Sequence, residues 1–258
     1  MASEKRLPTR STRRLRSVGL ARTLSKLGYC SRSQAAELVR AGRVSLNGRP
    51  SRNPETPVQM GRDRIEVDGR QVRSAEKTYL ALNKPRGLVT TASDEKGRDT
   101  IYSCLPPGLR WVGPVGRLDQ SSEGLLLLTN DTKWASLITA PESHLEKTYH
   151  VRVNGVADEQ LMAKLMSGVE SDGELLRATK ARLVRGGEKR SWIEVTLDEG
   201  KNRQIRRMFE QLGLEVLRLV RIGIGPLPLG DLPKGEWRRL SAEEKKEIDA
   251  ALKAGSRR

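Results

Sequence analysis

The sequence is poor in the residues that build several common kinds of site. Its 258 residues include one Phe, four Tyr and four Trp, so a binding platform made of many stacked aromatic rings is not expected. Cys30 and Cys104 are the two cysteines, and His144 and His150 are the two histidines; none has metal-ligand spacing to another. We therefore expect buried thiols rather than a disulfide framework, and we predict no zinc site.

Longer patterns are missing as well. No apolar run reaches the ~18 residues that a membrane-spanning helix needs. No G-x-G-x-x-G turn has an acidic residue at the right distance after it, and no Walker loop is present, so no nucleotide cofactor is predicted. The glycine-rich residues 223–226 follow an expected strand and open no helix, which favours a bend. The N-terminus has no apolar region typical of a secretory signal, and we expect a cytoplasmic location.

Positive charge is what the chain has in excess. Lys and Arg number 48 against 32 acidic residues, which gives a formal net charge of +16. Such an excess favours a polyanionic partner, because basic side chains that bind phosphate release counterions. Nucleic acid is the leading candidate, with residues 1–17 expected to be a basic disordered arm that touches phosphate. The length is compatible with about two domains.

Residues 18–73 have the pattern of a small basic domain. Leucines at helical spacing precede Gly28, and Ser31 with Gln34 predicts a capping box at the start of a second helix that Gly42 ends. Short segments in which apolar and polar residues alternate follow, and one of them precedes the tight-turn pair Asn47-Gly48. The sequence therefore predicts two helices followed by short strands. The alternative interpretation of its arginines is a solvated face without a binding role.

The order of residues 24–48 is more specific than their charge. This stretch resembles the small RNA-binding domain that is shared with a small-subunit ribosomal protein. In that family the second helix and the basic turn after it contact structured RNA. The resemblance implies that the RNA contacts are Arg32, Ser33, Arg40 and Arg43. Such contacts would be made mainly to phosphate and shape.

Residues 78–240 are predicted to form a second, larger domain, followed by a charged helix or tail over 241–258. Strands are expected at 79–82, 125–129, 148–153, 193–197 and 216–222, and helices near 161–166 and 205–212. Strands and helices do not alternate strictly. We therefore expect an α+β fold whose mixed, mainly antiparallel sheet has flanking helices.

One segment of this domain carries a carboxylate in a distinctive setting. Gly116-Arg117-Leu118-Asp119 precedes a polar turn and then four consecutive leucines, 125–128. An apolar run bounded by turn formers indicates a buried strand, which would place Asp119 on a loop held against the core. A turn residue without chemistry is the alternative for Asp119.

Two further segments accompany the Asp119 loop: 146–151, which contains Tyr149, and 199–208, Glu-Gly-Lys-Asn-Arg-Gln-Ile-Arg-Arg-Met. Together with Asn83-Lys84-Pro85-Arg86-Gly87 and residues 217–226, they make the chain resemble bacterial ribosomal RNA pseudouridine synthases of the RsuA family over nearly its whole length. In place of Thr132, many relatives have Gly, a difference expected to alter a turn rather than chemistry.

The resemblance implies an isomerase that converts uridine to pseudouridine in ribosomal RNA without metal or organic cofactor. It implies that Asp119 is the nucleophile that detaches the base, and that Tyr149 stacks on the flipped base and takes a proton late in the reaction. It also implies that Arg206 pairs with the catalytic carboxylate. RNA contacts near the cleft are expected at Lys84, Arg86, Arg117 and Arg203. The protein is expected to act as a monomer on ribosomal RNA or a pre-ribosomal particle, without a membrane.

Simpler interpretations exist for each of these side chains. Arg206 could be a solvated helix charge, Tyr149 a half-buried strand aromatic, and the other basic residues solvated. The competing functions are a non-catalytic ribosome-assembly factor with the same fold and a methyltransferase. The methyltransferase would need a cofactor-binding glycine turn, which is missing.

Overall fold

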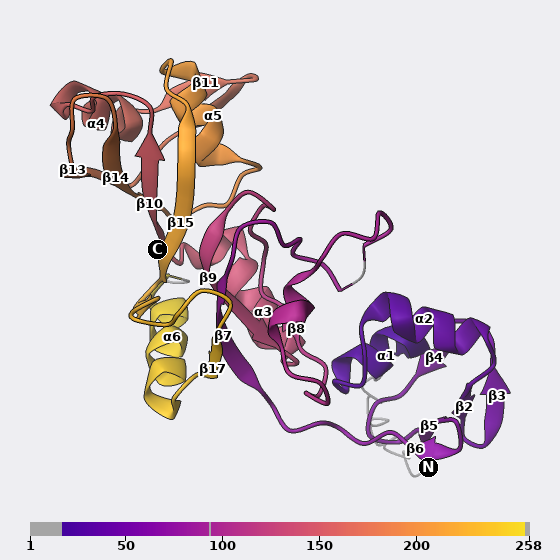
Figure 1. Cartoon of the computed structure of the whole chain (residues 1–258). Coiled ribbons are helices and arrows are strands. Elements are labelled where there is room, and N and C mark those ends of the chain that lie inside the picture. Colours follow the sequence, from indigo (N-terminus) through magenta and orange to yellow (C-terminus); the bar gives the residue numbers. More distant parts are fainter. Residues whose placement is uncertain (1–16, 93, 256–258) are drawn as a thin grey trace, which may run out of the picture. The chain divides into compact units, whose positions relative to one another are not determined.

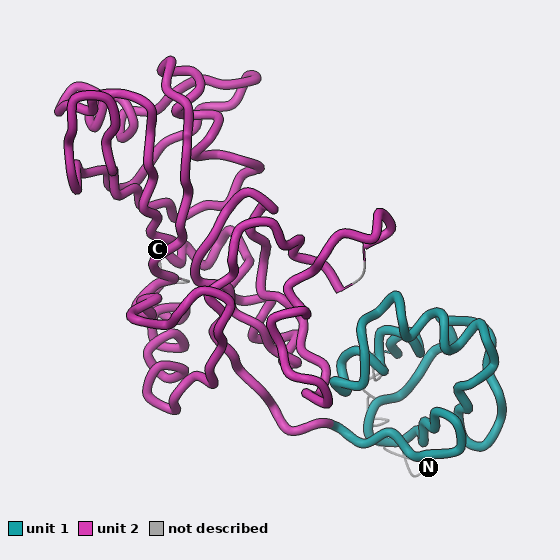
Figure 2. The backbone as a smooth tube through the Cα atoms, viewed as in Figure 1, with its two compact units in different colours: residues 1–74 teal, residues 75–258 magenta. Residues whose placement is uncertain are grey.

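The computed structural model describes residues 17–92 and 94–255, and the chain forms two compact units, residues 1–74 and 75–258 (Figure 2). The basic arm expected over residues 1–17 lies, except for its last residue, outside the described residues. None of the helices in the described part of the chain is long and apolar enough to cross a membrane.

The first unit is made of two helices and short strands (Figure 1). Its helices are α1, Leu20–Lys26, and α2, Arg32–Arg40. Strands β1 (Val18–Gly19) and β4 (Pro57–Val58) pair with each other. A four-stranded sheet has the order β3-β2-β5-β6, with bounds Arg49–Ser51, Val44–Leu46, Ile65–Val67 and Arg70–Gln71. The prediction of two helices followed by strands is confirmed except for β1, which precedes α1.

Local sequence signals account for the turns of this unit. The Ser31 hydroxyl accepts from the Gln34 amide at 3.2 Å, and the Gln34 side chain accepts from the Ser31 amide at 3.1 Å, so the predicted capping box is formed. Asn47 and Gly48 both have positive φ, 52° and 80°, as a two-residue hairpin turn requires. The helices then close over a core that contains Leu20, Leu24 and Val39, each fully buried.

The second unit is built on one nine-stranded sheet, with the main order β13-β14-β10-β15-β9-β7-β17. Their bounds, in that order, are Lys180–Arg185, Ser191–Leu197, Lys147–Val153, Val216–Ile224, Glu123–Thr129, Tyr79–Lys84 and Trp237–Arg239. Strand β8 (Gly113–Pro114) pairs with β9, and β16 (Leu227–Pro228) pairs with β15. Strands β15 and β9 pair in parallel, whereas the other pairings are antiparallel. The predicted mixed, mainly antiparallel sheet is confirmed.

Helices cover the sheet in two groups. Helices α4 (Glu159–Ser167) and α5 (Gln204–Gln211) bury their apolar residues against β10, β14 and β15. Helices α3 (Thr132–Thr139) and α6 (Ala242–Gly255) do the same against β7 and β9. The remaining elements are the hairpin β11–β12 and two short 3₁₀ helices, with bounds Val169–Ser171, Glu174–Leu176, Ile101–Cys104 and Pro141–Ser143. The expected C-terminal helix or tail is thus a packed helix up to Gly255, and its end lies outside the described residues.

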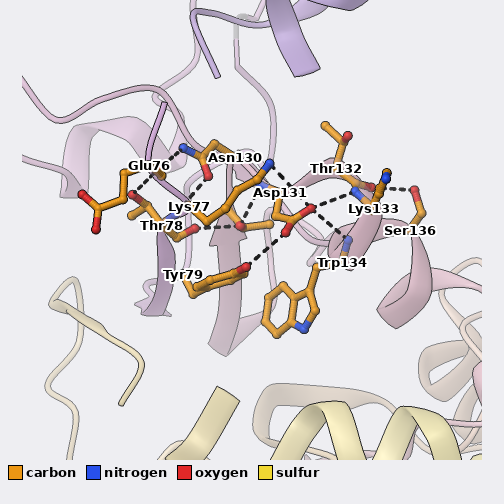
Figure 3. A network of polar contacts seen from close by, with 11 residues as sticks. Glu76, Lys77, Thr78, Tyr79, Asn130, Asp131, Thr132, Lys133, Trp134 and Ser136 are labelled. Carbon is orange, nitrogen blue, oxygen red and sulfur yellow. Dashed lines mark hydrogen bonds and ion pairs between the residues drawn. The ribbon is translucent and has the colours of Figure 1, made fainter. Parts of the chain in front are cut away.

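A polar network joins the start of β7 to the end of β9 (Figure 3). The Asn130 side chain accepts from the Thr78 amide at 2.9 Å and donates to the Glu76 carbonyl at 2.8 Å. Asp131 caps α3 by accepting from the Lys133 and Trp134 amides, and its other oxygen accepts from the Tyr79 hydroxyl at 3.0 Å. Thr132 is the first residue of that helix. The network ties down the far end of the strand that begins just after Asp119.

Candidate active site

Asp119 lies on the loop between β8 and β9, which a neighbouring turn braces. The Gly87 amide donates to the Gln120 carbonyl at 2.8 Å, and the Gln120 side chain donates back to the Gly87 carbonyl at 3.0 Å. Within the loop, the Ser122 amide donates to the Asp119 carbonyl at 3.0 Å. The Asp119 side chain is 38% exposed, so its carboxylate is held at the surface of a rigid support.

Lys84 supports this loop from inside the protein. Its side chain is fully buried, and its ammonium donates to the carbonyls of Asp119 at 3.1 Å, Ser122 at 2.9 Å and Pro85 at 3.1 Å. Burial lowers the pKa of the ammonium to about 8, although the charges of Asp119 and Glu123 oppose that shift. The predicted phosphate contact at Lys84 is wrong, because a side chain enclosed in this way cannot reach RNA.

The basic residue in the ion pair with Asp119 is Arg203. Its Nη1 lies 3.8 Å from Asp119 Oδ2. Arg203 occupies the N-cap position of α5 in the left-handed conformation, with φ 48°, and its side chain makes no capping hydrogen bond within the described residues. Arg206, one turn into the helix, donates instead to two backbone carbonyls, Ser121 at 3.3 Å and Val216 at 3.1 Å. Among the described residues the expected Arg206–Asp119 ion pair is therefore not formed.

Arg206 nevertheless contributes charge at the site. Burial lowers the pKa of its guanidinium, the charge of Arg203 lowers it further, and the Asp119 carboxylate opposes both effects. A guanidinium keeps its charge under such shifts. Arg206 thus places a half-buried cation within electrostatic range of Asp119 while its hydrogen bonds hold the Asp119 loop.

A cavity of about 460 Å³ brings the three predicted catalytic residues together. Asp119 lines it from the loop, Tyr149 from strand β10 and Arg206 from helix α5. Leu219 and Ile224 supply apolar wall, whereas basic side chains come from Arg117, Lys147, Lys201, Arg203 and Arg221. An apolar wall with a few polar groups is typical of a small-molecule or base-binding pocket. A carboxylate beside an aromatic ring in such a pocket can act as nucleophile or base on a bound ring.

A second hollow, of about 560 Å³, is also lined by Asp119. Four arginines line it: Arg86, Arg98, Arg117 and Arg203. Three of these were predicted from the sequence, whereas Arg98 was missed. Arg98 is held by two bonds to Asp94, from Nε at 3.0 Å and Nη2 at 2.6 Å. The Asp–Arg spacing of four residues in a polar loop was the available signal.

The residues predicted to bind RNA in the first unit lie around helix α2. Arg32 and Ser33 begin the helix, Arg40 ends it, and all three are exposed. Arg43 follows in the turn and makes a two-bond pair with Asp68, at 2.9 and 2.5 Å. Three of these side chains thus point to solvent, and the fourth shares its charge with an acid.

Both cysteines are free and half-buried, and the described residues hold no group of three or more His, Cys, Asp or Glu that could bind a metal.

Comparison with known proteins adds family matches in both units. Residues 78–211 match the model of RNA pseudouridylate synthase, and residues 18–65 match that of the S4 domain. A Bacillus subtilis protein named ribosomal large subunit pseudouridine synthase B is 37% identical over 92% of this chain and 97% of that protein. A Salmonella typhi protein of the same name is 38% identical over 86% of this chain and 78% of that protein. A crystal structure of a pseudouridylate synthase has a TM-score of 0.64 and 31% identity, covering 90% of this chain and all of that one.

Proposed function

Because the chain belongs to the RNA pseudouridylate synthase family and carries an S4 domain, we propose that it converts uridine to pseudouridine in large-subunit ribosomal RNA. The choice of RNA is supported by the names of two relatives from different bacteria, both called ribosomal large subunit pseudouridine synthase B. The observation that carries the reaction is the cavity that both Asp119 and Tyr149 line. We propose further that the protein works in the cytoplasm as a monomer, without metal or organic cofactor.

The reaction proposed for Asp119 is a substitution at the ribose. A carboxylate oxygen attacks C1′, and the bond between C1′ and N1 breaks with its electron pair on N1. The base turns, C5 bonds to C1′, and the carboxylate leaves. Loss of the proton on C5 and gain of one on N1 complete an isomerisation that needs no other reactant. A carboxylate can serve as such a covalent catalyst when it is ionised.

The neighbouring side chains fit supporting roles. The target nucleotide has to leave its stack before its sugar and base can enter a cavity in protein. Tyr149 offers its ring to the flipped base, and its phenol oxygen takes the C5 proton as the hydroxyl releases its own proton to solvent. Arg203 and Arg206 favour the charged form of Asp119 once RNA excludes water. Lys84 and Arg206 hold the loop backbone, so the carboxylate meets C1′ in a preset position.

The remaining basic residues are proposed to hold the RNA around the flipped nucleotide. Arg86, Arg98, Arg117 and Arg203 line the hollow next to Asp119, where the phosphates that flank the target can lie. In the S4 domain, Arg32, Ser33, Arg40 and Arg43 are the proposed contacts to structured RNA. These contacts position the substrate, whereas the cavity selects the base.

The test compares ribosomal RNA from three strains: a deletion strain and the same strain complemented with wild-type or Asp119→Asn protein. Carbodiimide labelling followed by mapping of reverse-transcription stops locates each pseudouridine. We expect at least one stop to depend on the wild-type protein and to be absent with Asp119→Asn. Asp231→Asn, which changes an exposed acid elsewhere in the same unit, should restore the stop. A stop that Asp119→Asn also restores would refute the catalytic role and favour the non-catalytic assembly factor.

A further inference from the structure

On strands β10 and β14, one face of the sheet carries no helix that belongs to an apolar core of the described chain. In strands β10 and β14, the residues that pack against α4 and α5 include Val151, Val153, Ile193 and Val195. Side chains alternate along a strand, so the residues between them point to the opposite face. That opposite face is polar, and none of its residues on these two strands belongs to an apolar core of the described chain.

Four residues on this opposite face form a row across four adjacent strands. Arg185 of β13 faces Trp192 of β14, Trp192 faces Arg152 of β10, and Arg152 faces Arg218 of β15. Neighbouring strands lie about 4.8 Å apart, so the row spans roughly 14 Å. The order Arg-Trp-Arg-Arg puts three guanidinium groups and one large ring in a single line. We call these four residues the arginine–tryptophan row.

Charge in this row is only partly balanced. Arg218 pairs with Glu123 at 2.9 Å, and its guanidinium carbon lies 5.9 Å from the centre of the Trp192 ring. Arg152 and Arg185 have no ion pair within the described part of the chain. Arg152 moreover sits directly opposite Arg218, and like charges in that relation destabilise a sheet. The neighbouring row differs, since Glu194 accepts from Arg182 and contacts His150.

We propose that the arginine–tryptophan row binds a second segment of the RNA substrate, with phosphates on Arg152 and Arg185 and a base on the partly exposed Trp192. Guanidinium groups bind phosphate with two parallel hydrogen bonds, and a ring beside a basic track is typical of surfaces that bind single-stranded nucleic acid. An acidic protein segment would use the arginines but would have no planar base for Trp192. RNA is therefore the favoured occupant.

This segment is distinct from the nucleotide in the cavity. Tyr149, which lines the cavity, belongs to the core face of β10, whereas Arg152 belongs to the opposite face. The RNA would have to pass around the edge of the sheet to contact both faces. The inference rests on the proposed function for its choice of RNA, and it predicts that long substrates gain affinity that a short stem–loop cannot.

The test measures affinity as a function of salt for the full-length protein. The RNAs are a large-subunit ribosomal RNA transcript and a stem–loop that contains only the mapped target. Arg152→Ala with Arg185→Ala removes two phosphate contacts, each of which contributes about 0.7–0.9 to the slope of log affinity against log salt. We expect the slope on the long RNA to fall by about 1.5. Between roughly 50 and 200 mM salt, the fold-loss of affinity should therefore be about eight times smaller for the variant than for wild type.

Lys246→Ala with Lys253→Ala is the matched control, because it removes two exposed positive charges from helix α6 of the same unit. The control should keep the wild-type slope, and both double variants should keep the wild-type affinity for the stem–loop. An unchanged slope for the Arg152/Arg185 variant on the long RNA overturns the proposal. So does an equal fall in slope for both variants, since the effect would then be one of net charge.

A second readout follows Trp192 itself. Binding of the long RNA should quench tryptophan fluorescence in wild type, and Trp192→Phe should lose most of that quenching while keeping the melting temperature within a few degrees. Quenching that persists in Trp192→Phe counts against base stacking at this position. Pseudouridine formation in the stem–loop is measured separately, so failure of the proposed reaction and failure of the proposed surface give different results.

Discussion

Replacing Lys84 by Met should disable the site by releasing its support rather than by changing a group that touches RNA. Met has a similar length but cannot donate, so the carbonyls of Pro85, Asp119 and Ser122 lose the donor that they share. A buried carbonyl left without a partner costs about 1–3 kcal/mol. The Asp119 carbonyl keeps the Ser122 amide as a donor, so the two remaining losses give about 4 kcal/mol. Met also removes the cost of burying the ammonium.

The pKa of Lys84 sets the size of that second effect. Folding lowers the pKa from 10.5 to about 8, and each pKa unit corresponds to about 1.4 kcal/mol. The wild-type protein therefore carries a cost of about 3 kcal/mol at pH 7, which is relieved as pH rises from 8 toward 10.5. At pH 7 the variant should lose about 1 kcal/mol net of unfolding free energy. Its stability should also lack the wild-type rise between pH 8 and 10.5.

Three measurements on one sample test this reasoning. Urea unfolding across pH gives the stability difference, single-turnover assays give the rate of pseudouridine formation, and amide hydrogen exchange reports on the loop. We expect the rate to fall at least about tenfold and the Ser122 and Gly87 amides, which are bonded to loop carbonyls, to lose protection. Leu128→Ala, a fully buried change at the other end of β9, provides a variant whose stability loss, about 2–5 kcal/mol, exceeds that of Lys84→Met. If Leu128→Ala slows the reaction as much as Lys84→Met, or if the loop amides stay protected in Lys84→Met, the positioning role is refuted.

Other substitutions test separate parts of the structure. Gly124→Ala should lower the melting temperature sharply or prevent folding, because φ is +103° and a Cβ would lie 2.2 Å from the Arg221 carbonyl oxygen. Gly200→Ala is the control in the same melting assay, because a Cβ at Gly200 would meet open space. Tyr149→Phe should keep RNA affinity within about twofold in a filter-binding assay, since stacking is retained, whereas Tyr149→Ala should weaken it about tenfold; equal affinities would argue against stacking. Trp134→Phe removes the 2.9 Å hydrogen bond to Asp249 and should cost about 1 kcal/mol in urea unfolding, and no change would mean that this bond does not help to dock α6.

Elements set by nearby residues could be predicted from the sequence. The capping box at Ser31 and the turn at Asn47-Gly48 depend on groups at most three residues apart, and the structure has both. The helix around Ile205 follows from apolar residues at i, i+3, i+4 and i+7, because a helix places these positions on one face. In these cases the local sequence pattern and the tertiary environment favour the same conformation.

The features that escaped prediction depend on contacts between distant segments. Helix α3 has eight residues and buries only Trp134 and Ile138, which is too few for a clear period. Strand β13 is an edge strand with no buried residue in its pattern, so its sequence does not alternate in the expected way. Lys84 lies in a basic turn typical of solvent, and only the fold brings the Asp119 and Ser122 carbonyls around its ammonium.

The basic residues around Asp119 are divided between two tasks. Lys84 donates to the carbonyls of Asp119 and Ser122, and Arg206 donates to the carbonyl of Ser121, so both cations bind the backbone of the loop. Their charges still favour an ionised carboxylate nearby, although their hydrogen bonds are used elsewhere. Among the residues that the structure describes, Arg203 alone forms an ion pair with the carboxylate, and at 3.8 Å it is too distant for a hydrogen bond. The Asp119 oxygens therefore remain free to attack C1′ in the proposed reaction, because the field that keeps them charged comes from groups that do not occupy them.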